Sequence, residues 1–93
     1  MKEVNEKKKP FGPIIRVEPM EGCVLRVVFD NGNSVTVDFS PRLKTFRFGI
    51  LKDETVWRTA DTDSVFVHWH QSGLNVVEVA YDEIMRMTLG EGY

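Results

Sequence analysis

The stretch that decides the fold reads Cys23-Val-Leu-Arg-Val-Val-Phe-Asp-Asn-Gly-Asn-Ser-Val-Thr-Val-Asp-Phe39. Two runs rich in β-branched residues flank the turn signal Asp30-Asn31-Gly32, which is typical of a β-hairpin. A two-residue loop at Asn31-Gly32 sets apolar side chains against polar ones across the strands. A three-residue loop with Gly32 in the left-handed conformation of a bulge aligns apolar residues with each other. The sequence therefore predicts a bulged hairpin over 23–39.

This register sorts the hairpin side chains onto two faces. The apolar face carries Leu25, Val27, Phe29, Val35, Val37 and Phe39, and the more polar face carries Arg26, Val28, Ser34, Thr36 and Asp38. Because exposed apolar side chains often mark interaction sites, we expect the polar face and a neighbouring strand to bind a protein partner or a second copy of the chain. The residues expected there are Arg26, Val28, Thr36 and Phe66. Two alternatives stay open: the C-terminal helix covers this face, or the edge of a strand at 14–18 pairs with a partner.

Around the hairpin, short periodic segments predict further elements. Alternation at 14–18 indicates a strand with Ile15 and Val17 inward, stopped by Pro19. Ser40-Pro41 indicates the start of a short helix whose buried contacts are Leu43 and Phe46.

The second half of the chain predicts a brief helical turn, a second strand and a final helix. The helical turn spans 53–57 with Trp57 inward, and 61–63 is a turn. The strand at 64–70 places Val65, Val67 and Trp69 on one face and Phe66, His68 and His70 on the other. From Asn75, which resembles a cap with Glu78, helical spacing predicts a C-terminal helix of about three turns.

Length and composition fit one domain. The chain has 93 residues, of which 42% are hydrophobic and 28% charged. We expect a flexible N-terminal tail at 1–13, a single domain at 14–89 and a C-terminal tail at 90–93. The predicted fold class is α+β, with a small antiparallel sheet around the central hairpin, short helical turns and a C-terminal helix.

Charge and cysteine content narrow the function classes. The net charge of −2 gives no general attraction to nucleic acid, and Glu3 and Glu6 dilute the basic run Lys7-Lys8-Lys9. No apolar run approaches the roughly 18 residues of a membrane-spanning helix. The single cysteine, Cys23, fits a reducing compartment. We therefore expect a cytoplasmic protein with no membrane association, no direct nucleic-acid contact and no cofactor.

Few residues in the sequence suggest a catalytic or metal-binding site. His68 and His70 lie two apart on a strand, so both imidazoles face one side at a spacing that can chelate a metal, but no third ligand is adjacent. Cys23 stands at a strand start, where it fits a small apolar residue better than a nucleophile. The aspartates fall at turns and caps. We predict that the protein is not an enzyme and holds no metal, with His68 and His70 as the candidates if one is bound.

Several of these motifs resemble the bacterial family called domain of unknown function 2442. They are Val17-Glu18-Pro19, the hairpin from Leu25 to Gly32, Val37-Asp38-Phe39, the stretch from Leu51 to Trp57, and Trp69 followed by Gly73. Trp57 and the turn His70-Gln71-Ser72-Gly73 depart from the family pattern. The resemblance implies a small α+β sheet domain of unassigned activity. Some relatives resemble this domain fused to a helix-turn-helix of the repressor type, and others lie beside small partner proteins in arrangements similar to toxin–antitoxin pairs.

Three functional hypotheses follow. The first is a non-catalytic protein-interaction module, because the chain is well patterned yet lacks a convergent polar site. The second, suggested by the resemblance, is a nucleic-acid-linked regulator or antitoxin-like protein that acts with a partner. The third is a metal-binding protein that uses His68 and His70.

Overall fold

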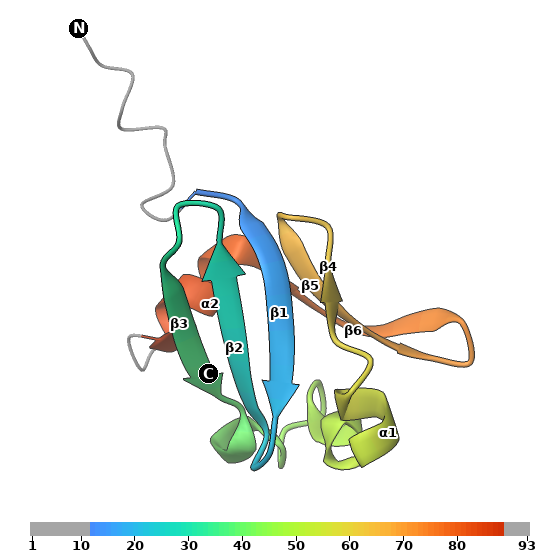
Figure 1. Ribbon diagram of the computed structural model, residues 1–93. Helices are drawn as coiled ribbons and strands as arrows, with labels where there is room; N and C mark the ends of the chain where they lie inside the picture. The colour runs from blue at the N-terminus through green and yellow to red at the C-terminus, as the bar shows by residue number, and fades with distance from the viewer. Residues whose placement is uncertain (1–11, 89–93) are drawn as a thin grey trace, which may run out of the picture.

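The computed structural model describes residues 12–88 of the chain. Nearly all of the predicted tails, at 1–13 and 90–93, lies outside that range. The described chain forms two antiparallel sheets of three strands each, with helical segments between and after them (Figure 1). This arrangement confirms the α+β class, and it divides the strands between two sheets where the sequence indicated one.

The elements follow one another in a simple order. The first sheet contains β1 (Ile14–Met20), β2 (Val24–Phe29) and β3 (Ser34–Asp38), with β2 in the centre. The 3-10 helices η2 (Ser40–Arg42) and η3 (Gly49–Lys52) and the helix α1 (Glu54–Trp57) connect it to the second sheet. That sheet contains β4 (Asp61–Thr62), β5 (Phe66–Gln71) and β6 (Leu74–Ala80), and helix α2 (Tyr81–Thr88) follows.

The bulged hairpin register is confirmed. Leu25 pairs with Val37 and Val27 with Val35, so apolar side chains meet across β2 and β3. Gly32 has φ +89°, and its amide donates to the carbonyl of Phe29 at 3.1 Å. A side chain at such a φ would be strained, which is why the turn places glycine there.

The core joins the two sheets through aromatic rings centred on Phe39. This fully buried ring makes edge contacts with Phe48, Trp57 and Trp69 at centroid distances of 5.7, 5.6 and 5.4 Å. Trp57 and Trp69 stack at 5.7 Å, and the indole nitrogen of Trp69 donates to the Trp57 carbonyl at 3.1 Å. Trp57 thus turns inward as predicted, and its indole nitrogen donates to the carbonyl of Met20 at 3.0 Å. Satisfied indole donors let both tryptophans be buried at little cost.

The first strand differs from the prediction in which residues face the core and in where the strand ends. A bulge between Ile14 and Arg16 makes Ile14 fully buried and leaves Ile15 53% exposed, whereas Val17 does pack against the core. The strand also continues through Pro19 to Met20. Pro19 pairs with Leu25 at a position where the backbone nitrogen points away from β2, so its missing N–H costs no ladder bond.

The predicted three-turn C-terminal helix is wrong over 75–80. These residues belong to β6, where buried Val77 and Val79 alternate with exposed Glu78. The helix α2 spans only Tyr81–Thr88, so Asn75 is no cap. The start of α2 is capped instead by Glu83, whose carboxylate accepts a hydrogen bond from the backbone amide of Ala80 at 3.2 Å. A glutamate three residues after the first cap residue makes this bond in a capping box.

Three smaller expectations also fail. Phe46 is 106% exposed rather than buried, and Phe48 takes the core position, while Leu43 is partly buried as expected. Val65 is 55% exposed because β5 begins only at Phe66. The segment 61–63 is not only a turn, because Asp61 and Thr62 form β4.

Candidate functional site

The predicted interaction residues divide between the two sheets. Arg26 and Thr36 are cross-strand partners on the outer face of the first sheet, where Arg26 Nη1 also pairs with Glu18 Oε1 at 2.9 Å. Val28 lies on the same strand but is only 7% exposed, so it offers little contact area. Phe66 belongs to β5, in the second sheet, and its ring lies 6.1 Å from that of His68. The structure therefore brings Arg26 and Thr36 together and places Phe66 apart.

Helix α2 covers the opposite face of the first sheet. Its buried residues Tyr81, Ile84 and Met87 belong to the same core cluster as Leu25 and Val27. The ring of Tyr81 meets that of Phe29 edge-on at 5.9 Å. Figure 1 shows α2 behind the sheet on that side. The outer face with Arg26 and Thr36 is thus not the face that α2 covers, which excludes the alternative that the C-terminal helix covers it.

Contacts and a proline occupy single positions on the edges of β1 and β6. At β1, the amide of Ile14 donates to the carbonyl of Ser64 at 3.2 Å, and Pro19 presents no N–H to the outside. Figure 1 shows β4 beside this edge. At β6, Arg47 Nη2 donates to the Glu78 carbonyl at 2.7 Å. Occupied carbonyls and a proline are the devices by which proteins keep strand edges from pairing further.

The edge of β3 is different. At the turn end of the hairpin, the amide of Phe29 donates to the carbonyl of Asn33 at 2.9 Å. At the open end, the amide of Phe39 donates to the carbonyl of Cys23 at 2.8 Å, so the residue pairs at both ends are hydrogen-bonded pairs. By strict alternation, the backbone groups of Ser34 and Thr36 then point away from β2. Within residues 12–88 these four N–H and C=O groups have no hydrogen-bond partner. Further along, Arg42 Nη1 occupies the Asp38 carbonyl at 3.0 Å, so the open part of the edge is 34–36.

Of the two histidines on β5, His68 is engaged by neighbouring polar side chains. His68 Nε2 lies 3.3 Å from Asp63 Oδ2, and its Nδ1 lies 3.1 Å from Glu78 Oε2. His70 stacks on His68 with ring centroids 6.3 Å apart. Asp63 itself accepts from the amides of Val65 and Phe66, and these two backbone bonds are the main cause of its lowered pKa. In the described part of the chain, no three histidine, cysteine or acidic residues lie close enough to hold a metal ion.

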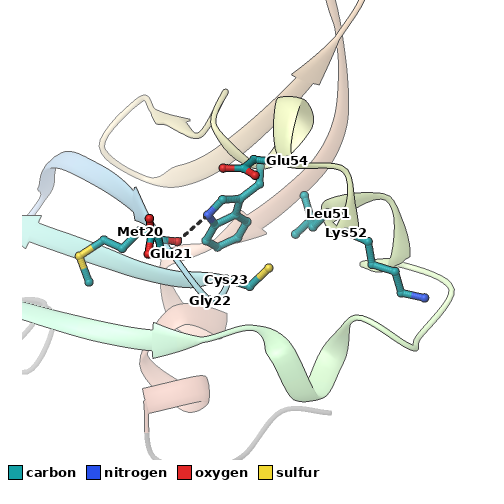
Figure 2. A pocket seen from close by; sticks show the side chains of 8 residues that line it. Met20, Glu21, Gly22, Cys23, Leu51, Lys52 and Glu54 are labelled. Atoms are coloured by element: carbon teal, nitrogen blue, oxygen red, sulfur yellow. Dashed lines mark hydrogen bonds between the residues drawn. The ribbon is translucent and has the colours of Figure 1, made fainter.

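A hollow of about 240 Å³ opens where the turn between β1 and β2 meets η3 and α1. Figure 2 shows Cys23 and Leu51 facing the space between these segments, with Lys52 extending away from it. Burial is the main cause that raises the pKa of the Cys23 thiol, followed by the negative charges of Asp38 and Glu54. A raised pKa keeps the group a thiol at neutral pH, which is opposite to the activation that a nucleophilic cysteine requires.

The structure contains one cluster of polar side chains that no pattern in the sequence predicts. Arg47 forms a two-pronged ion pair with Glu83, at 2.6 and 2.9 Å, and its guanidinium stacks 4.7 Å from the centre of the Phe48 ring. Its hydrogen bond lowers the pKa of Glu83, and the same bond raises the pKa of Arg47. The two residues lie 36 positions apart, so neither periodicity nor local spacing connects them.

Comparison with family models, with curated proteins and with solved structures finds no match to this chain. The resemblance to domain of unknown function 2442 therefore stays a prediction from the motifs. No helix within residues 12–88 is long and apolar enough to cross a membrane.

Proposed function

We propose that the protein is a non-catalytic protein-interaction module that binds an extended segment of a partner protein along the edge of β3. The observation that carries the proposal is the set of outward backbone groups on Ser34 and Thr36, which have no partner within the described chain. Addition of a strand to such an edge provides main-chain hydrogen bonds, and side-chain neighbours on each face add specificity. β4 has only two residues, and the edges of β1 and β6 carry a contact or a proline at single positions.

The side chains around this edge define the segment that it would accept. On the outer face the new strand would lie beside Thr36, with Arg26 one strand further in. On the inner face it would lie beside Val35, which is partly buried against the core. Because successive residues of a strand point to opposite faces, the fitting segment alternates polar and apolar side chains.

The polar groups considered as catalytic candidates have structural roles, which supports a non-catalytic function. Asp63 caps the turn before β5 and holds His68. Asp53 accepts from the amide of Thr55 at the start of α1. Burial raises the pKa of the Cys23 thiol, which is opposite to the change that would make it a nucleophile. Groups that are committed to caps and turns are poorly placed to transfer protons to a substrate.

The experiment is a comparison of two substitutions at one position. In Thr36→Pro the outward N–H is lost and a ring projects from the edge, while the bonds of β3 to β2 remain, because Thr36 makes none of them. Thr36→Val is the matched control, since it changes the side chain and keeps the N–H. We expect the tagged wild type to capture a stoichiometric partner from lysate, Thr36→Val to keep that partner, and Thr36→Pro to lose it.

Circular dichroism and urea unfolding must show that both variants fold. Retention of the same partner by folded Thr36→Pro would contradict docking at this edge. Capture at low and high salt also separates the alternatives, because nucleic acid that binds through phosphates is released by salt. Titration of the purified protein with Zn²⁺ tests the histidine hypothesis directly.

A further inference from the structure

Phe46 lies on the surface between two residues that are anchored by hydrogen bonds. Its side chain is 106% exposed, the largest value among the exposed large hydrophobic residues of the described chain. The residues on both sides of it are anchored: Thr45 donates through its amide and its hydroxyl to the Arg42 carbonyl, at 3.0 and 2.7 Å, and Arg47 is paired with Glu83. Because the backbone on both sides is already ordered, binding through this ring restricts little beyond the Phe46 side chain itself, and aromatic side chains are typical interaction anchors.

The hollow beside Cys23 has the size and lining to accept one aromatic ring. Its volume of about 240 Å³ exceeds the roughly 150 Å³ in which an engineered protein cavity binds benzene. It is smaller than the roughly 300 Å³ at which pockets for cofactors and drug-sized ligands begin. The lining is apolar where Met20, Cys23, Leu51 and Trp57 meet, and it is charged at Glu21, Lys52 and Glu54.

The ring and the hollow belong to one end of the molecule. The connection that carries Phe46 joins η2 to η3, and η3 contributes Leu51 to the hollow. Figure 1 shows the segment 40–57 and the turn between β1 and β2 together at the lower end. Because the segment that carries Phe46 and the segments that form the hollow lie at the same end, a two-fold axis through that end can bring each ring toward the hollow of the other copy and close the assembly.

We infer that two copies of this chain associate through this end, with Phe46 of each copy inserted into the hollow of the other. Charge also favours a second copy as the occupant. Lys44 lies two residues before Phe46, and Glu21 lies on the rim of the hollow, and neither has an ion-pair partner within the described chain. Insertion therefore brings a lysine of one copy toward a glutamate of the other. This contact is independent of the β3 edge and of the proposed partner.

Sedimentation over a dilution series of the untagged full chain tests the inference. We expect a concentration-dependent dimer in the wild type, and a dissociation constant about 100-fold higher in Phe46→Ala, because two buried phenylalanine side chains are lost per dimer. Leu74→Ala is the matched control, since Leu74 is 69% exposed but lies at the start of β6 in the second sheet. It should leave the dimer unchanged. A wild type that stays monomeric up to about 1 mM, or a Phe46→Ala variant that dimerises normally, overturns the inference.

Alkylation of Cys23 reports on the hollow itself. At mildly alkaline pH, iodoacetamide should react more slowly with the wild type as the protein concentration rises, because the inserted ring covers the thiol. In Phe46→Ala the rate should not depend on protein concentration. If the alkylation rate of the wild type is also independent of protein concentration, the hollow stays open at every concentration. That result would overturn the inference, even if the chain forms a dimer through another surface. If the Phe46→Ala variant still captures the partner that binds the β3 edge, self-association and partner binding use different surfaces.

Discussion

Replacement of Phe39 by leucine tests whether this ring joins the two sheets. Phe39 is fully buried and makes three edge contacts with Phe48, Trp57 and Trp69. Truncation of a buried phenylalanine to alanine costs about 3 to 5 kcal/mol, and each aromatic pair contributes about 0.5 to 1.5 kcal/mol beyond area burial. Leucine keeps most of the apolar volume and loses the ring contacts. We therefore expect Phe39→Leu to lower the free energy of unfolding by about 1.5 to 3 kcal/mol.

That loss is large against the total stability of a chain of this length, which is about 5 to 14 kcal/mol. Urea unfolding followed by tryptophan fluorescence measures it, because Trp57 and Trp69 both touch the substituted ring. The midpoint should fall by about 1 M with an unchanged slope, since small proteins lose about 1 to 3 kcal/mol of stability per molar urea. Near-ultraviolet circular dichroism should change as the stacked indoles lose a neighbour.

The matched control is Phe46→Leu, in which the same residue type is changed on the surface. Because Phe46 is 106% exposed, its replacement should alter the free energy of unfolding of the monomer by less than about 0.5 kcal/mol. Equal midpoints for the wild type and Phe39→Leu, or an equal loss in the two variants, would refute the account of the core.

Three further predictions concern the turn, the edge and the ion pair. Gly32→Val should destabilise the hairpin by about 1 to 2 kcal/mol in urea unfolding, because the φ of +89° strains a β-branched residue. Pro19→Val should change stability by less than about 1 kcal/mol, because the nitrogen of Pro19 faces outward, and a larger loss would contradict the β1 register. Glu83→Gln should cost about 0.5 to 1 kcal/mol at pH 7. Since Arg47 lowers the pKa of Glu83 from 4.5, the folded state holds this stability above pH 4.5 and loses it as the pH falls through the lowered value, so the wild type and Glu83→Gln should converge in acid.

The hairpin was predictable because its signals agree at two levels. The turn residues around Gly32 specify a loop length, and the alternation in both strands specifies which register buries apolar residues. The same reasoning located Trp57, Val67 and Trp69 in the core. Each of these residues lies in a segment where the pattern and the local turn chemistry give one answer.

The failures arise where one pattern fits two structures. Val77, Tyr81 and Ile84 fit a helical period, yet Val77 and Val79 also alternate, and pairing with β5 made the strand the favoured structure. Phe46 and Phe48 both fit the inward position, and the structure buries Phe48 against Phe39 while Arg47 is anchored to Glu83. That contact spans 36 residues, so local sequence carries no trace of it.

The candidate site was predictable in part for the same reason. The register predicted that Arg26 and Thr36 share the outer face. The contacts that Arg47 makes on the edge of β6 and that Ile14 makes with Ser64 on the edge of β1 are both long-range, so local sequence does not reveal them. The hollow likewise forms between the β1–β2 turn and η3, which are distant in the sequence.

Amide hydrogen exchange at β3, measured by NMR, tests the central claim most directly. In the isolated protein we expect the amides of Val35 and Val37 to exchange slowly, because they bond to β2, and those of Ser34 and Thr36 to exchange fast. When the captured partner is added, the Thr36 amide should become protected. Protection of Thr36 in the protein alone, or fast exchange of Thr36 in the complex, would contradict docking at this edge.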